Sequence, residues 1–176
     1  MSTTKWALDP THSELQFKVK HLMITTVTGS IKSFSAELSS DGDDFTNANI
    51  SFSGDISSID TGNGDRDGHL KSGDFFDAEK YPAITFKSTS VEKDGSDYIV
   101  KGDLTIKDVT KTVKLTAEFG GVATDPWGNN KAGFTLSGKI NRTEFGLTWN
   151  AALETGGVMV SEDVKILGEL QFVKQA

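Results

Sequence analysis

Apolar and polar residues alternate along most of this chain. Leu15, Phe17 and Val19 alternate with charged or amide neighbours, and the same spacing returns many times. The other alternating runs span residues 34–38, 47–56, 84–86, 98–106, 113–119, 134–140, 145–149 and 164–172. A period of two places apolar side chains on one face, which is typical of an antiparallel strand with one side in a core and the other in water. The pattern predicts about nine strands.

Turn signals separate these runs. They include Asp41-Gly42-Asp43, Asp94-Gly95-Ser96, Gly120-Gly121 and the stretch 125–130. Short strands joined by turns, without long intervening helices, are typical of an all-β sandwich or barrel. Neither a linker nor an internal repeat interrupts residues 1–176, so we expect a single domain.

Two segments lack the alternation. Residues 61–81 mix charges with Leu70, Phe75 and Phe76, and Pro82 ends the stretch. We expect one or two short helices over about residues 63–80, lying across an open end or flank of the β structure because the two adjacent phenylalanines need burial. We also expect residues 153–163 to form a loop.

Three strand glycines fall on the inward-facing parity, namely Gly102, Gly138 and Gly168. A glycine inside a strand often marks a bend or a close approach of a ligand or another backbone. A barrel of about eight strands can be filled by side chains or can hold one small ligand. The glycines therefore leave two interpretations open, bends that help the barrel close or room for a ligand.

The charge and cysteine content exclude several classes of protein. There are 25 acidic and 18 basic residues, for a net charge of -7. That balance argues against nucleic acid or an anionic membrane surface as the main partner. Because there is no cysteine, disulfides, zinc–thiolate centres and thiol nucleophiles are excluded. No stretch has the length of a membrane-spanning helix or a signal-peptide core, so we expect a cytoplasmic protein, or a periplasmic one if a leader has been removed.

Candidate catalytic groups are few. His12 and Ser13 would point to opposite faces of a strand, which is poor geometry for a base and its nucleophile. The three histidines have neither the spacing of a metal site nor a zincin motif, so we expect no metal and no cofactor. Arg66 and Arg142 either pair with acidic residues or hold a polar head group by forked hydrogen bonds.

The order of several motifs resembles the YceI-like family, the lipocalin-like, polyisoprenoid-binding proteins of bacteria. The first motifs are Trp6-x-x-Asp9-Pro10-x-His12-Ser13, Phe17-x-x-x-His21-Leu22 and Arg66-x-x-His69-Leu70-x-x-x-x-Phe75-Phe76-x-x-x-x-Tyr81-Pro82-x-Ile84-x-Phe86. The later motifs are Gly102-x-Leu104-Thr105-Ile106-x-x-Val109-Thr110, Trp127-Gly128, Asn141-Arg142-x-x-Phe145-Gly146-x-x-Trp149 and Val164-x-Ile166. The resemblance covers residues 6–172. It implies an extended eight-stranded antiparallel barrel with an apolar channel and a helical segment packed over it.

The leading hypothesis is a non-catalytic protein that sequesters or transports a long apolar lipid, a polyisoprenoid or an isoprenoid quinone, in the barrel interior. The residues expected to contact the lipid tail are Phe17, Phe52, Phe86, Leu104, Phe134, Phe145, Trp149 and Ile166. Those expected at a polar head group are His12, Arg66, His69 and Arg142. Two alternatives stay open, an enzyme that uses the barrel as a tunnel for an isoprenoid-type substrate and a ligand-free, stress-related structural protein with a solid core. A homodimer is also compatible with the sequence.

Overall fold

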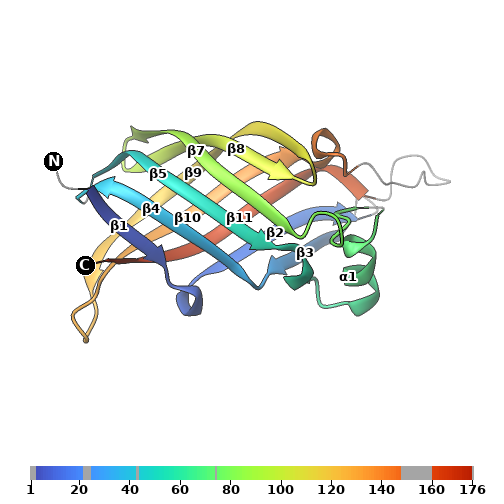
Figure 1. Ribbon diagram of the computed structural model, residues 1–176, viewed down its shortest axis with the longest axis horizontal. Coiled ribbons are helices and arrows are strands. Elements are labelled where there is room, and N and C mark those ends of the chain that lie inside the picture. The colour runs from blue at the N-terminus through green and yellow to red at the C-terminus, as the bar shows by residue number, and fades with distance from the viewer. Residues whose placement is uncertain (1–2, 22–24, 43, 74, 148–159, 176) are drawn as a thin grey trace.

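The computed structural model describes residues 3–21, 25–42, 44–73, 75–147 and 160–175, and antiparallel strands dominate it (Figure 1). The strands are β1 (Thr3–Leu8), β2 (Glu14–His21), β3 (Thr25–Ile31), β4 (Phe34–Asp41), β5 (Asp44–Asp55), β6 (Ile59–Asp60), β7 (Ala83–Asp94), β8 (Asp97–Ile106), β9 (Val109–Thr124), β10 (Asn130–Asn141) and β11 (Val160–Lys174). The helical elements are α1 (Gly64–Lys71) and three short 3₁₀ turns, η1 (Pro10–His12), η2 (Ile56–Ser58) and η3 (Arg142–Phe145).

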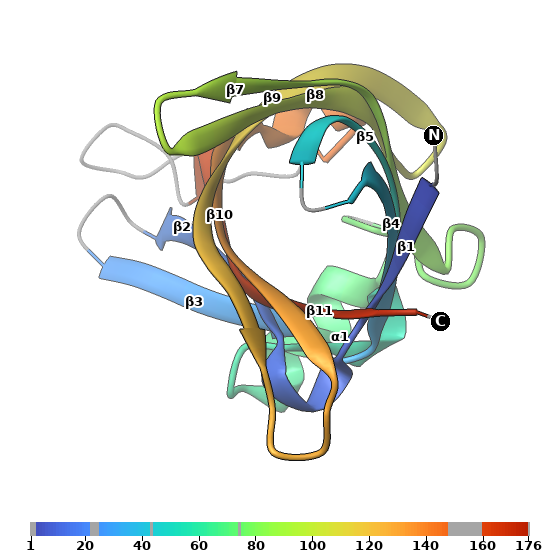
Figure 2. The same ribbon diagram turned by 90° about the vertical axis from the view of Figure 1, so that its left-hand side faces the viewer.

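Eight of these strands close into a barrel. Around the ring their order is β1-β4-β5-β7-β8-β9-β10-β11, and β1 pairs back onto β11 through Trp6 opposite Lys174 and Leu8 opposite Phe172. A view along the long axis shows the ring (Figure 2). The structure confirms the extended eight-stranded antiparallel barrel with a short helix that the family resemblance implies.

The barrel is long because β2, β3 and β6 continue the walls that β1, β4 and β5 begin. Strand β11 is 15 residues long. Its last residues pair with β1, whereas residues 160–169 pair with β2. The turn η1 separates β1 from β2, and β3 passes from β2 to a short pairing with β6. The barrel is therefore elongated by strands that are interrupted and then continue in the same direction, as β1 continues into β2 after η1 and β5 into β6 after η2.

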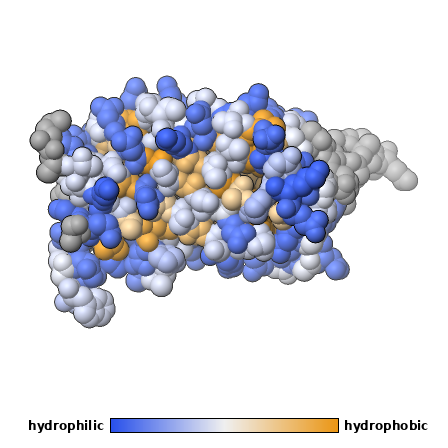
Figure 3. All heavy atoms as spheres, viewed as in Figure 1, coloured by the Kyte–Doolittle hydropathy of each residue, from blue (hydrophilic) through white to orange (hydrophobic). Residues whose placement is uncertain are grey.

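The two-residue alternation places apolar side chains inside the barrel and polar side chains on its outer surface. In β8, for example, Tyr98, Val100, Leu104 and Ile106 are buried while Lys101 and Asp103 are exposed. The outer face is accordingly mostly hydrophilic in a space-filling view, with apolar residues visible in a band across its middle (Figure 3).

Aromatic side chains on β1, β5, β8, β9, β10 and β11 pack together. Strand β1 and the last residues of β11 lie at the end of the barrel that carries both termini (Figure 1). We call this set the aromatic cluster, and its members are Trp6, Phe45, Tyr98, Phe119, Phe134 and Phe172. Phe45 is 2% exposed, and its ring centroid lies 5.1–6.1 Å from those of three of its neighbours, Tyr98, Phe119 and Phe134. The buried indole N–H of Trp6 donates to Ser40 Oγ at 2.8 Å, so the cluster contains no unsatisfied indole donor.

The helical segment lies at the opposite end (Figure 1), but it is shorter than predicted. Of the described residues between 63 and 80, only Gly64–Lys71 form an α-helix. Asn63 caps its start by accepting from Arg66 N–H, and Ser72 ends it in an extended conformation. Beyond Ser72 the backbone N–H groups of Phe75 and Asp77 return to the Ser72 carbonyl, which makes tight turns in place of a second helix. The predicted burial of the two phenylalanines holds, since Phe75 is buried and Phe76 packs against the core.

Two further predictions are wrong in part. The run 145–149 is not a strand in its described portion, because the chain leaves β10 at Asn141, turns through η3 and reaches Gly146 in the left-handed region, φ 80°. Residues 148–149 lie outside the described ranges. Of the predicted loop at 153–163, residues 160–163 belong to β11, and the rest lies outside the described residues. Within those ranges, no helix is long and apolar enough to cross a membrane.

Candidate functional site: an internal cavity

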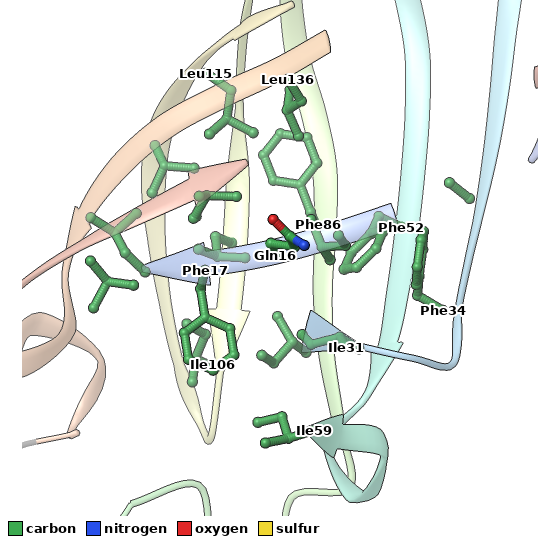
Figure 4. Close-up of a pocket in the computed structure, with 18 of the residues that line it drawn as sticks. Gln16, Phe17, Ile31, Phe34, Phe52, Ile59, Phe86, Ile106, Leu115 and Leu136 are labelled. Carbon is green, nitrogen blue, oxygen red and sulfur yellow. The ribbon is translucent and has the colours of Figure 1, made fainter. Parts of the chain in front are cut away.

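A cavity of about 620 Å³ occupies the barrel interior (Figure 4). Every described strand except β1 contributes to its wall. The wall is formed almost entirely by apolar side chains, and it runs from the aromatic cluster, where Phe45, Tyr98 and Phe172 form part of it, to His69 and Leu70 on α1. The volume lies within the roughly 300–1,000 Å³ that small-molecule sites occupy.

Most of the predicted tail-contacting residues lie on this wall. They are Phe17, Phe52, Phe86, Leu104, Phe134 and Ile166. Phe17, Phe52 and Phe86 surround the cavity in Figure 4. Their contact with a ligand stays a prediction, but their side chains are where such a contact requires them.

Phe145 and Trp149 fare differently. Phe145 is 1% exposed, yet it is a core residue of η3 and does not line the cavity. The alternation fails there because η3 replaces the strand on which the prediction depended. Trp149 lies outside the described residues.

The three inward glycines that the sequence singles out touch neighbouring side chains. A Cβ atom built on Gly102 would lie 2.5 Å from Phe86 Cζ, and one on Gly138 would lie 2.3 Å from Leu115 Cδ2. A Cβ on Gly168 would meet Leu136 Cβ at 3.4 Å. Each of these glycines is therefore approached closely by another group. At Gly102 and Gly138 that group is a side chain of the cavity wall.

Polar side chains line the cavity at the α1 end. They are Thr61, Asn63, Asp65, Arg66, His69 and Arg142. Arg66 is held in place because its Nε donates to Thr61 Oγ1 and its Nη2 to the Thr61 carbonyl, both at 2.8 Å. Thr61 in turn donates to Asp67 Oδ1 through its N–H (2.9 Å) and its hydroxyl (2.6 Å). The segment before α1 is thereby fastened to the helix.

The hydrogen bonds from Thr61 also affect the pKa of Asp67. Burial raises the pKa of its carboxyl, but the hydrogen bonds from Thr61 and the charges of Lys71 and Arg66 outweigh burial and lower it. The carboxylate is therefore the stable form under ordinary conditions.

Arg142 brings a buried cation to the cavity wall. It is 3% exposed, and its Nη1 donates to the Leu147 carbonyl at 2.5 Å. Burial lowers the pKa of its guanidinium, whereas the negative charge of Glu162 raises it. The His69 ring packs edge-on against Phe75, with centroids 5.1 Å apart. Three of the predicted head-group residues, Arg66, His69 and Arg142, thus line one cavity.

His12 is the exception among them, because it lies outside the cavity. Its Nδ1 is 2.8 Å from Asp9 Oδ2 and its side chain is 56% exposed. Hydrogen bonds from Thr11 and His12, together with the Lys131 ammonium 3.0 Å away, hold the pKa of Asp9 well below its usual range. These contacts tie the η1 turn to β10, and His12 is not among the residues that line the cavity.

Sequence reasoning missed several wall residues. Gln16 lines the cavity although it occupies the polar parity of β2, so alternation gives no signal for it. Asn63 and Asp65 line the cavity from the start of α1, where no period-two pattern exists. In the described part of the chain, no group of three or more His, Asp or Glu side chains is placed to hold a metal ion.

Comparison with known proteins agrees with this geometry. The family model for the YceI-like domain matches residues 6–172. The chain belongs to the YceI-like family. A UPF0312 protein of Staphylococcus epidermidis is 44% identical over 170 residues, which covers 96% of this chain and 97% of the relative. A UPF0312 protein of Staphylococcus aureus is 42% identical with the same coverage.

Solved structures share the YceI-like barrel. BcnA of Burkholderia cenocepacia superposes with a TM-score of 0.79 at 26% identity, covering 93% of this chain and 98% of that one. The YceI protein of Campylobacter jejuni gives a TM-score of 0.75 at 36% identity, covering 89% and 90%. A polyisoprenoid-binding domain from Saccharophagus degradans gives 0.71 at 18% identity, covering 97% and 98%. At that identity the last likeness concerns the fold alone.

Proposed function

We propose that this YceI-like protein binds a long apolar lipid of the isoprenoid type inside its barrel and carries or sequesters it. The observation that carries the proposal is the cavity of about 620 Å³, apolar along its length and polar at the α1 end. Protein interiors are ordinarily close-packed, with few voids larger than a water molecule. An apolar cavity of this size leaves wall atoms without contacts, which a bound lipid tail would supply.

The energetics favour a long ligand. Burial of apolar surface contributes roughly 25 cal/mol per Å², or about 0.8 kcal/mol per methylene group. Affinity should therefore rise with tail length until the cavity is full. The polar α1 end provides for a head group, for which Arg66, His69 and Arg142 are the proposed contacts.

The chemistry of the wall supports binding in preference to catalysis. The long apolar part of the cavity presents aliphatic and aromatic side chains, and the titratable side chains on its wall are Asp65, Arg66, His69, Tyr98 and Arg142. Tyr98 belongs to the aromatic cluster, and Arg66 and Arg142 already donate to Thr61 and Leu147. The Saccharophagus degradans domain, which shares the fold, is described as polyisoprenoid-binding, and this supports an isoprenoid ligand. A cytoplasmic location and a role under stress stay predictions.

The test is extraction of the natively purified protein with organic solvent, followed by mass spectrometry of the extract. We expect an apolar lipid with an isoprenoid tail. In parallel, protein stripped of lipid should gain melting temperature on addition of geranylgeraniol, because a ligand that binds only the folded state stabilises it. An empty extract together with no thermal shift would refute the proposal.

A matched pair of variants places the ligand. Ile166 lies on the cavity wall, whereas its neighbour Lys165 points outward and is exposed. Ile166→Trp should fill part of the cavity and reduce uptake of geranylgeraniol, while Lys165→Trp should leave uptake unchanged. Equal uptake by both variants would mean that the lipid does not bind in the barrel.

A further inference from the structure

Three large side chains of the cavity wall lie against glycines. A Cβ atom built on Gly29 would lie 2.3, 2.7 and 2.9 Å from three atoms of the Phe17 ring. One on Gly102 would lie 2.5 and 2.8 Å from two atoms of the Phe86 ring, and one on Gly138 would lie 2.3 Å from Leu115 Cδ2. We call Gly29, Gly102 and Gly138 the seat glycines, because the neighbouring side chain occupies the space that their own Cβ would need.

Strand register produces these contacts. Gly29 on β3 is directly opposite Phe17 on β2, and Gly138 on β10 is directly opposite Leu115 on β9. Phe86 reaches Gly102 diagonally, since Gly102 pairs with Ser88, two residues along β7. Cross-strand neighbours in direct or diagonal positions are within reach of aromatic and long side chains.

The contacts are specific to these positions and are not shared by every strand glycine. Gly133 on β10 has nothing within 4 Å of an added Cβ, although it belongs to the same strand as Gly138. Gly54 is intermediate, because Phe52 Cζ would lie 3.1 Å away. Gly133 is therefore the natural control for a glycine-to-alanine substitution in this barrel.

A side chain that rests on a glycine lies along the wall and does not cross the cavity. If the glycine gains a methyl group, the ring cannot move outward, because the strand backbone lies there, so it must turn toward the cavity. The seat glycines consequently determine how wide the cavity is at Phe17, Phe86 and Leu115, all of which line it.

We propose that the seat glycines set the selectivity of the cavity for chain cross-section, so that it admits a methyl-branched isoprenoid chain. This inference rests on the proposed function. A methyl branch makes a chain wider than an unbranched polymethylene chain, so a narrowed cavity disfavours the branched chain first. Selectivity of this kind comes from the shape of the wall and needs no polar contact.

The experiment compares geranylgeraniol with the straight-chain alcohol that has the same number of main-chain carbons. Gly29→Ala is the primary variant, because the nearest atoms to its new methyl group all belong to the Phe17 side chain. Overpacking of this kind should lower affinity for geranylgeraniol about tenfold and affinity for the straight-chain alcohol less than about threefold. Gly133→Ala should leave both affinities unchanged.

A second substitution tests the cause. In Gly29→Ala/Phe17→Ala the side chain opposite the new methyl group no longer reaches it, so affinity for geranylgeraniol should return toward the wild-type value. Phe17→Ala alone should widen the cavity and raise the preference for the branched alcohol, which keeps the proposal testable if Gly29→Ala folds poorly. Gly102→Ala is less suitable, because its Cβ would also lie 2.5 Å from the backbone carbonyl oxygen of Lys87.

The outcomes separate the two proposals. If wild-type protein binds neither alcohol, the proposed function fails. If wild-type protein binds them and folded Gly29→Ala keeps the same ratio of affinities, or loses both equally without rescue by Phe17→Ala, only the role of the seat glycines is overturned.

Discussion

The two ends of the barrel are built from the same alternating strands. Packed rings close the cavity at one end, here called the solid end, whereas polar side chains line the cavity at the other, here called the hollow end. At the terminus-bearing end, inward rings meet inward rings, and the aromatic cluster forms that end of the cavity wall. Toward α1, the Phe17 and Phe86 rings rest on glycines, and polar side chains such as Thr61 and Arg66 line the cavity. The difference teaches that a glycine beside an inward phenylalanine gives the ring a place along the cavity wall, as at Phe17 and Phe86.

The largest effect should come from opening the solid end. Phe45 is 2% exposed and contacts Trp6 and three other rings. Phe45→Ala should lower the free energy of unfolding by about 3–5 kcal/mol, through lost transfer energy and a new void. Urea denaturation measures this. Trp127→Ala is the control, since Trp127 is 83% exposed. A loss no greater than that of the control would contradict the role of the aromatic cluster.

A smaller effect should follow from removing the polar contact within the solid end. Trp6→Phe deletes the indole donor to Ser40 Oγ and some packing volume. Because Ser40 Oγ keeps its own hydrogen bond to the Gly42 carbonyl, no group is left unpaired, and the lost hydrogen bond together with the smaller ring should cost about 1–2 kcal/mol. A double-mutant cycle with Ser40→Ala should show coupling between the two sites. Additive losses would show that the hydrogen bond contributes nothing.

A substitution at the hollow end should lower the free energy of unfolding only slightly but should weaken ligand binding. Thr61→Val removes the hydroxyl that links Arg66 to Asp67 but keeps the backbone N–H. We expect a loss of about 1 kcal/mol and a weaker response of melting temperature to geranylgeraniol. Thr105→Val is the control, because the Thr105 hydroxyl forms an exposed hydrogen bond with Thr110 Oγ1 on the neighbouring strand. A large stability loss without a binding change would reverse the assignment of the two ends.

The smallest effect is the pH dependence that Asp67 contributes at the hollow end. Because the folded-state pKa of Asp67 lies below its ordinary value, its contribution to stability is present above the unfolded pKa of about 3.9 and is lost as pH falls through the folded pKa. Asp67→Asn should therefore reduce the loss of stability on acidification below about pH 4. Melting curves over this range, set against wild type, measure it. An unchanged acid response would show that the Thr61 hydrogen bonds do not stabilise the carboxylate.

Much of the fold followed from sequence because alternation is local. Tyr98, Val100, Leu104 and Ile106 are inward in the structure, as their spacing predicts. Where the backbone leaves the strand conformation, the same reasoning fails. Phe145 shares the parity of its run but belongs to η3, and His12 belongs to the η1 turn on the outside of the barrel.

The site was predictable in its composition and not in its arrangement. Phe17, Phe86 and Ile166 were expected on the wall and are found there. That Phe17 rests on Gly29 was not predictable, because nothing in either segment specifies that β2 and β3 pair with these two residues opposite each other. Gln16 was not predicted either, because it occupies a polar position in the alternation of β2 and yet lines the cavity.

By itself the sequence determined which face of each strand is apolar, where the chain turns and to which family it belongs. Those properties depend on residues that are neighbours along the chain, within the reach of a two-residue period. Only the tertiary structure decided that eight strands close on one another, that rings meet rings at one end and glycines at the other, and that a cavity remains between them. Such features depend on the register between strands distant in sequence, which the summed packing of the whole barrel selects.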